Sequence, residues 1–213
     1  MNSNVPKPMV ELLGKPICAH TLEAFERCPQ IDSVIVVGHG GQLERLREIV
    51  ERYRFQKVTK IVAGGEQRHE SVANGIAALD RDTQIVVVHD GARPLVSRRL
   101  IEEAVKLCGT WDAVVAAVPV KQTVKQVNRR SLCVEQTLDR NGLWEAQTPQ
   151  VFKKDILMKA HAQNTQDNPT DDAVMVERLG VKVKIIEGDY TNIKITTRED
   201  LIVAEGFLKG AAC

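Results

Sequence analysis

The chain has 213 residues, which is enough for one sizeable hydrophobic core and a tight fit for two. Its 29 basic and 28 acidic residues give a net charge of +1, so no overall field draws it onto nucleic acid or an anionic membrane, and an anionic partner must be held by local groups. No apolar run is as long as a bilayer span and the N-terminus lacks the apolar core of a secretory signal, so we expect a cytoplasmic protein.

Short β-branched runs alternate with longer amphipathic stretches, which predicts βα units around a mostly parallel sheet. In chain order we expect a helix over 20–28, a strand over 33–38, a helix over 42–53, a strand over 59–65, a helix over 69–79, a strand over 85–90, a helix after Ser97 and a strand over 113–118. The sequence therefore predicts an α/β fold.

The rhythm breaks at Pro119. Residues 122–140 alternate apolar and polar around the turn "NRRS", which predicts a β-hairpin arm. Such an arm has too little core to stand alone, so we expect it to pack on another subunit. A helix after Pro149, a second from about Asp171, the strand 181–188, the short "NIKIT" and a C-terminal helix follow. We expect a single domain over 1–213, with 120–140 as an arm subdomain.

The stretch "VVVHDGARP" ends an apolar strand in His89, Asp90 and Arg93. In open α/β sheets the ligand lies beyond the carboxyl ends of the strands, so these side chains are site candidates. A carboxylate beside a desolvated strand is costly unless it binds a cation or a donor, and Mg²⁺ with substrate phosphates would satisfy Asp90. Alternatively, Asp90 and Gly91 only form a turn and Arg93 is solvated.

Other constellations are weaker taken singly. In "GGEQRHES", Gly64 and Gly65 precede a helix, and they either form a turn or let a flat base approach, with Ser71 reading its edge. The stretch "LDRNGLWEAQTPQVF" combines Arg140, a Trp and hydroxyl or amide groups, which suits a small anionic polyol or merely a strand with a Trp on the core.

The cysteines and histidines disfavour two kinds of site. The five cysteines are odd in number and scattered without a C-x-x-C pair, which argues against a disulfide framework and a zinc knuckle. The five histidines form neither H-x-x-x-H nor H-E-x-x-H, so we expect no tightly held transition metal.

Six collinear motifs together resemble the 2-C-methyl-D-erythritol 4-phosphate cytidylyltransferase family of the non-mevalonate isoprenoid pathway. They are "PKPMVELLGKPICAHTL", "GGEQRHESVANGI", "VHDGARP", "DRNGLWEAQTPQVF", "TDDA" and "NIKITTREDL". The resemblance implies a three-layer, nucleotide-diphospho-sugar-transferase-like α/β fold and a homodimer joined by exchanged β-arms. It also implies transfer of CMP from CTP to methylerythritol phosphate with release of pyrophosphate.

The resemblance also assigns roles to residues of this chain. Asp90 would bind Mg²⁺, and together with Lys7 and Lys194 would form the catalytic set. The residues assigned to CTP are Lys7, Lys194, Gly64, Gly65, Glu66 and Ser71. Those assigned to methylerythritol phosphate, some of them reaching across from a partner's arm, are Arg93, Thr123, Arg140 and Thr148.

One family feature does not occur in the sequence. Family members open with a strand and a loop of the type A-A-G-x-G-x-R-M that wraps the triphosphate, whereas this sequence starts at "MNSNVPK". Without that strand we expect neighbouring strand edges to be exposed. Two rival functions remain: a sibling cytidylyltransferase acting on ribitol 5-phosphate, and a catalytically impaired dimeric binding protein. A nucleotide-binding dehydrogenase is disfavoured because no G-x-G-x-x-G follows a strand.

Overall fold

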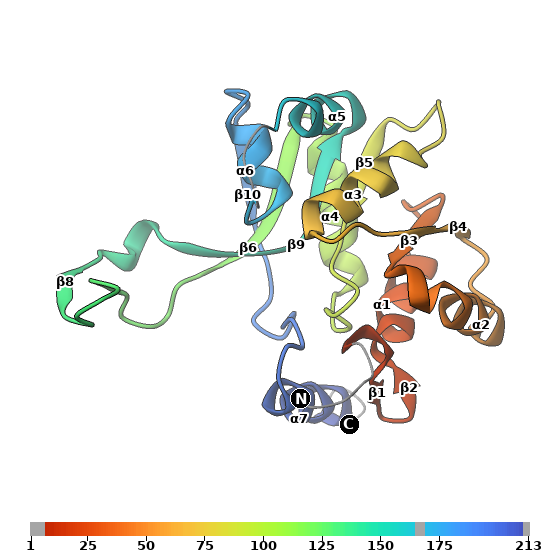
Figure 1. Ribbon diagram of the computed structural model, residues 1–213, viewed down its shortest axis with the longest axis horizontal. Coiled ribbons are helices and arrows are strands. Elements are labelled where there is room, and N and C mark those ends of the chain that lie inside the picture. Colours follow the sequence, from red (N-terminus) through yellow and green to blue (C-terminus); the bar gives the residue numbers. More distant parts are fainter. Residues whose placement is uncertain (1–6, 165–168, 211–213) are drawn as a thin grey trace.

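The computed structural model describes residues 7–164 and 169–210, which form a layered α/β body with one projecting arm (Figure 1). The central sheet has the strand order β10-β6-β9-β5. Its strands are β5 (Ile85–Val88), β6 (Ala113–Pro119), β9 (Trp144–Lys153) and β10 (Val183–Glu187). β10 is parallel to β6, whereas β9 is antiparallel to both β5 and β6. The predicted α/β fold is present, but the sheet expected to be mostly parallel is mixed, because β9 runs antiparallel to both of its neighbours.

Helices cover both faces of this sheet and the neighbouring strands. They are α1 (Ile17–Glu26), α2 (Leu43–Tyr53), α3 (Arg68–Ala77), α4 (Arg98–Cys108), α5 (Lys154–Ala162), α6 (Asp172–Glu177) and α7 (Arg198–Gly210).

Strand β6 is buried on both faces. Val114 and Ala116 pack with α1 and α4, whereas Ala113 and Val115 pack with α5 and α6. Successive side chains of a strand point to opposite faces, so one apolar run supplies two core layers. This is why "AVVAAV" is continuously apolar in the sequence.

Strands β3 (Val34–Gly38) and β4 (Val58–Ala63) form a separate parallel pair that packs against α1 and α2. Among the described residues no hydrogen-bonded ladder joins β3 to β5. Instead, a cavity of about 810 Å³ lies between residues 34–37 and 85–88, with α1 and α3 also lining it. Both β3 and β5 are half-buried and border this cavity.

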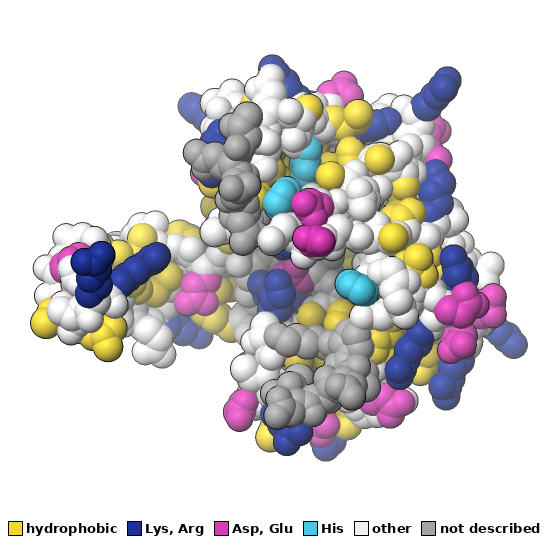
Figure 2. Space-filling model, in the orientation of Figure 1, with side chains coloured by type: hydrophobic (Ala, Val, Ile, Leu, Met, Phe, Trp, Pro, Cys, Tyr) yellow, Lys and Arg dark blue, Asp and Glu magenta, His cyan; other side chains and the backbone are white. Residues whose placement is uncertain are grey.

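The hairpin predicted over 122–140 is confirmed as β7 (Lys125–Val127) paired antiparallel with β8 (Val134–Thr137). It projects from the body, at the left of Figure 1. Its apolar side chains Val127, Leu132 and Val134 are exposed, Leu132 to 76%. Figure 2 shows hydrophobic side chains together with Lys and Arg on the arm. Nothing within the described chain covers them.

The C-terminal segment returns to the start of the chain. β1 (Glu11–Leu12) pairs with β2 (Lys15–Pro16), and Leu12, Ile17, Ile195 and Ala204 form a small core beneath α7. Burial of Ile195 fixes the "NIKIT" segment against the body, although no strand forms there. Within the described ranges, no helix has the length and apolarity needed to cross a membrane.

Candidate active site

Asp90 lies just beyond the end of β5 and is surrounded by three cationic side chains. Its Oδ2 is 3.2 Å from Lys194 Nζ and 3.2 Å from Arg93 Nε, and its Oδ1 is 3.8 Å from Arg68 Nε. Lys194 lies in the segment after β10, Arg93 lies in the loop after β5, and Arg68 is the first residue of α3. The fold therefore gathers three distant pieces of sequence around one carboxylate, as expected for a site at the carboxyl end of a strand.

The charge of Asp90 is stabilised by this surrounding. Burial alone would raise the pKa of the carboxyl group, but the charges of Lys194, Arg93 and Arg68 outweigh it and hold the pKa below its ordinary value. Arg68 also pairs with Asp172, so two carboxylates face three cations and one positive charge remains in excess at the site. Such a site favours an anionic ligand.

The backbone of Asp90 is held by Thr148 of β9. Thr148 Oγ1 lies 3.1 Å from Asp90 N and 3.0 Å from His89 Nδ1. Burial lowers the pKa of His89 to about 4, so the imidazole is neutral and has one donor and one acceptor nitrogen. Its Nε2 donates to Arg93 O, so the Thr148 hydroxyl donates to Nδ1 and accepts from the N–H of Asp90.

A second buried residue, Asn192, ties Lys194 and Arg93 to the same strand. The Nδ2 of Asn192 donates to Thr148 O at 2.8 Å, while its backbone carbonyl oxygen accepts from Arg93 Nη1 at 2.7 Å. Farther along, Ile195 N donates to Ala92 O. Since Ile195 is buried, the adjacent Lys194 points outward toward Asp90. The position of Lys194 therefore follows from its neighbours.

The glycine loop after β4 lies beside this cluster and is closed by Ser71. Gly65 N donates to Ser71 Oγ at 3.1 Å, and Ser71 Oγ donates to Gln67 O at 3.2 Å. A Cβ on Gly64 would lie 2.6 Å from Ser71 Oγ, so a larger residue there would require the Ser71 side chain or the loop to shift. Glu66 is exposed at the tip of the loop. Ser71, Arg68 and Asp90 all line the cavity described above.

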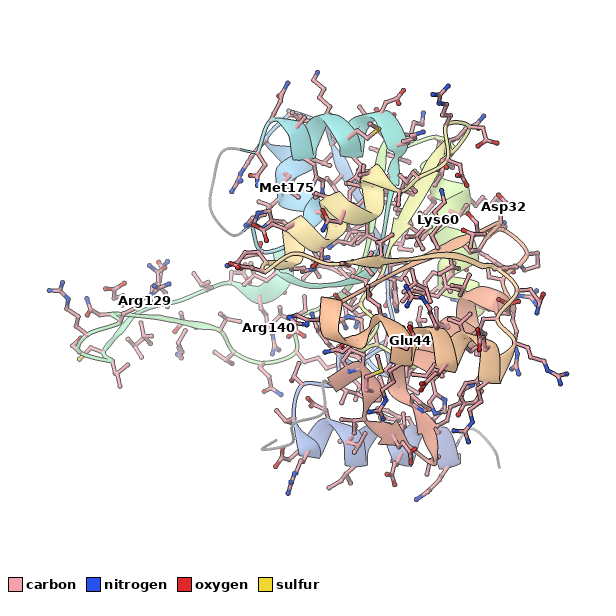
Figure 3. The ribbon with its side chains drawn as sticks, turned by 45° about the vertical axis from the view of Figure 1, so that its right-hand side comes forward. Asp32, Glu44, Lys60, Arg129, Arg140 and Met175 are labelled. Atoms are coloured by element: carbon pink, nitrogen blue, oxygen red, sulfur yellow. The ribbon has the colours of Figure 1, made fainter. Side chains whose placement is uncertain are left out.

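Two predicted site residues lie apart from Asp90 in this chain. Thr123 is exposed at the start of the arm, and Arg140 opens η3 (Arg140–Gly142) at its base, where its Nη1 donates to Lys121 O. Figure 3 shows Arg140 where the arm meets the body and Arg129 farther out. No contact between either of the two and the Asp90 cluster occurs in the described residues.

The remaining predicted residue is Lys7. It is the first residue of η1 (Lys7–Met9), and its side chain lies outside the described part of the protein.

Arg68 also belongs to the cluster, although its motif in the sequence assigns it no specific role. It lies within the glycine-rich motif, and its position in the first turn of a helix that begins beside the site was the available signal. Its two acidic partners are Asp90 and Asp172, the second of them 104 residues away along the chain, and pattern alone does not pair them.

Asp90 is the candidate ligand for Mg²⁺ in this site. No group of three or more His, Cys, Asp or Glu that could hold a metal is found among the described residues. Mg²⁺ is commonly bound by one or two carboxylates with substrate phosphates supplying further oxygens, and the partly exposed Asp90 fits that mode. The residues thus fit a Mg²⁺ that arrives with a nucleotide.

Comparison with known proteins gives one family. The family model described as 2-C-methyl-D-erythritol 4-phosphate cytidylyltransferase (IspD) matches residues 1–210. The protein of that name from Pelotomaculum thermopropionicum is 48% identical over 212 residues, covering 98% of this chain and 89% of the relative. The one from Caldanaerobacter subterraneus subsp. tengcongensis is 45% identical over 212 residues, covering 98% and 93%.

Solved structures give the same result. The 4-diphosphocytidyl-2C-methyl-D-erythritol synthase of Anaerococcus prevotii has a TM-score of 0.86 at 31% identity, covering 95% of this chain and 93% of that one. The 2-C-methyl-D-erythritol 4-phosphate cytidylyltransferase of Thermus thermophilus has a TM-score of 0.82 at 30% identity, covering 96% and 94%. The predicted fold class is confirmed by these likenesses.

Proposed function

The chain belongs to the 2-C-methyl-D-erythritol 4-phosphate cytidylyltransferase family and is a nucleotidyltransferase, and from this premise we propose how its residues transfer CMP from CTP to 2-C-methyl-D-erythritol 4-phosphate. Pyrophosphate is released, and the product is an intermediate of isoprenoid biosynthesis. The observation that carries the proposal is the cluster of Lys194, Arg93 and Arg68 around Asp90 at the end of β5.

The nucleotide end of the site is the glycine loop. Gly64 and Gly65 let the cytosine ring approach the backbone, while Glu66 and Ser71 surround the cytidine. Support comes from the absence of a side chain at Gly64 and from the hydrogen bonds that hold the loop in shape before a ligand arrives. A loop ordered in advance loses less entropy on binding.

The sugar-phosphate end is made of Arg93, Thr123, Arg140 and Thr148. Arg93 and Arg140 are guanidinium groups, which suit bidentate binding of a phosphate. Because Thr123 and Arg140 lie at the base of the arm, they serve the site of a partner protomer when the arms are exchanged. Thr148 already bonds His89 and Asp90, so it contributes chiefly by fixing that loop.

The reaction requires two polyanions to meet. A phosphate monoester has a second pKa near 6, so the attacking oxygen is largely charged at neutral pH and needs no general base. Lys194 and Lys7 neutralise the α-phosphate and hold the two substrates for in-line attack, so catalysis is positioning and electrostatic stabilisation. Mg²⁺ held at Asp90 would supply further neutralisation of the phosphates when CTP is bound.

The protein works as a cytoplasmic homodimer joined through residues 120–140 of the arm. Val127, Leu132 and Val134 are exposed on a hairpin whose strands have three and four residues, and such a hairpin is not stable alone. A partner that covers these side chains would gain their hydrophobic burial.

A turnover assay tests the function. Protein, CTP and Mg²⁺ are mixed with methylerythritol phosphate or, in parallel, with ribitol 5-phosphate, and pyrophosphate release is followed. We expect release with methylerythritol phosphate and a much lower kcat/KM with ribitol 5-phosphate. A higher kcat/KM with ribitol 5-phosphate, or CTP binding without any pyrophosphate, would overturn the proposal in favour of the sibling enzyme or a silent binding protein respectively.

A further inference from the structure

The "TDDA" motif contains a carboxylate that the proposed reaction does not use. Asp172, the first residue of α6, is fully buried, with 0% of its side chain exposed. Its Oδ2 accepts a hydrogen bond from Arg68 Nη1 at 2.6 Å, and its Oδ1 lies 3.0 Å from His161 Nε2. Asp172 therefore links the residue that starts α3 to α5.

A buried carboxylate is tolerated only when charged or polar donors replace its water. Asp172 satisfies this with a donor on each oxygen, and Arg68 in turn is held by a charge-assisted hydrogen bond to a carboxylate that is shielded from water. Arg68 is 30% exposed, so one side of its guanidinium group is anchored inside while the rest faces the cavity.

The anchor is itself held rigidly by β9. Asp171 caps α6 by accepting from Val174 N, and its other oxygen accepts from Gln150 Nε2 at 2.9 Å. Gln150 Oε1 accepts from Ala173 N. Gln150 lies two residues beyond Thr148 on the same strand, so β9 positions both Asp90 and the acid that holds Arg68.

Arg68 has N–H donors that are not used by its acidic partners. A guanidinium group has five N–H donors. Arg68 uses Nη1 toward Asp172, and its Nε faces Asp90 at 3.8 Å. In the described residues no acceptor is bonded to Nη2. Arg68 lines the same cavity as Ser71 and Asp90, which the proposed function assigns to the cytidine and to the Mg²⁺ that accompanies CTP.

We propose that Arg68 is a further phosphate-binding cation for CTP and that Asp172, oriented by His161, is the positioning residue that aims it. This inference rests on the proposed function for the identity of the nucleotide. A purely architectural ion pair between α3 and α6 is the competing explanation, and it predicts loss of stability without a selective loss of nucleotide affinity.

The test is a double-mutant cycle in the full chain. Arg68→Ala, Asp172→Asn and the double variant are compared by calorimetric titration with CTP and Mg²⁺, and by thermal melting. Asp155→Asn is the matched control, because it makes the same chemical change on an exposed aspartate in the first turn of α5, which neither contacts Arg68 nor lines the cavity.

We expect Arg68→Ala to weaken CTP binding by about 10-fold or more, the effect of one charge-assisted hydrogen bond. Asp172→Asn should weaken it similarly, and the double variant should be no weaker than Arg68→Ala, because the acid acts only through the arginine. Asp155→Asn should bind CTP as the wild type does. In the turnover assay the KM for CTP should rise while that for the sugar phosphate stays unchanged.

Normal CTP affinity in folded Asp172→Asn, or additive losses in the double variant, would overturn the proposal. If Asp172→Asn does not fold, Arg68→Ala decides, and an affinity equal to that of the wild type would refute it. Wild-type protein that binds CTP without releasing pyrophosphate contradicts the proposed function and not this inference, because the cycle reads binding.

Discussion

Thr148 Oγ1 accepts the backbone N–H of Asp90 across a sequence separation of 58 residues. Through this bond, and through its donation to the neutral His89, a strand in the second half of the chain fixes the loop that carries Asp90, the candidate Mg²⁺ ligand. The hydroxyl is 3.0 Å from one partner and 3.1 Å from the other, so one small side chain satisfies two buried polar groups.

Thr148→Val removes that hydroxyl while conserving shape. His89 Nδ1 and Asp90 N then lack a partner, and we expect the free energy of unfolding to fall by about 1–3 kcal/mol, the cost of an unsatisfied buried group. The kcat should fall too, since the Asp90 loop loosens. Thr148→Ser retains the hydroxyl and is the control. Urea unfolding and turnover measure both effects, and equal stability of the Val and Ser variants would contradict this role.

Replacement of Lys194 tests the electrostatic account. Lys194→Ala removes a cation that faces Asp90 at 3.2 Å and, in the proposed mechanism, the α-phosphate. We expect kcat to fall about 100-fold or more, as on loss of a group that stabilises transition-state charge. Arg140→Ala should instead raise the KM for the sugar phosphate. Lys106→Ala and Arg99→Ala, both exposed on α4, are the controls and should be near wild type. Wild-type kinetics in the Lys194 and Arg140 variants would refute both assignments.

The glycine loop gives a steric prediction. Gly64→Ala would place its Cβ 2.6 Å from Ser71 Oγ, so the loop must shift, and we expect a loss of about 1–3 kcal/mol in stability together with a higher KM for CTP. Gly206→Ala has no atom within 4 Å of the added Cβ and lies inside α7, so it should stabilise by up to about 1 kcal/mol. The melting temperature and the CTP affinity are measured for both variants. Equal values in the two variants would contradict a close-packed loop.

The arm should control oligomeric state. Leu132 is 76% exposed and has φ of 55°, a conformation that Asn tolerates, so Leu132→Asn removes apolar surface without strain. We expect it to weaken the dimer in sedimentation experiments. Ile202→Asn changes a residue on α7 that is 71% exposed and should leave the dimer intact. A monomeric wild-type protein, or equal effects of the two changes, would exclude the arm as the interface.

The cysteines should differ in reactivity. Burial raises the pKa of Cys18 and of Cys108 to about 11, so almost no thiolate exists near neutral pH, whereas Cys133 is exposed on the arm. The thiolate is the reactive form, so brief alkylation near neutral pH should label Cys133 and spare Cys18 and Cys108. Labelling of the two buried thiols should rise only as the pH approaches their pKa. Mass spectrometry of the peptides reads the outcome, and rapid labelling of Cys18 would contradict the packing of α1.

Much of the architecture follows from periodicity alone. Apolar spacing located the helices around α2 and α4 and the strands β3, β5 and β6 within a few residues of their observed bounds. Strand β9 was not predicted from periodicity, because it runs for ten residues through Pro149, and a proline within a strand pattern favours a turn. Its antiparallel course also makes the sheet mixed, and periodicity does not give strand direction.

The candidate site was partly accessible from the sequence. Asp90 and Arg93 follow the apolar run of β5 and Lys194 lies in the segment after β10, and their convergence agrees with the general rule for sheet edges. Asp172 was not singled out, because a buried polar side chain next to apolar neighbours gives no periodic signal and its partner Arg68 lies far away in the chain. Gln150 was expected among the polar groups that suit an anionic polyol, whereas its amide bonds to Asp171. Thr123 and Arg140 keep their assigned roles as predictions for a dimer.

The cavity between β3 and β5 has a mechanical consequence. The Gly64 loop follows the β3-β4 sheet and Asp90 follows the central sheet. No hydrogen-bonded ladder joins the two sheets in the described residues, so they can move relative to each other. A nucleotide that contacts both sheets would restrict this motion. Nucleotide binding should therefore slow amide hydrogen exchange in both β3 and β5. While it is bound, the substrate therefore stabilises the relative position of the two sheets.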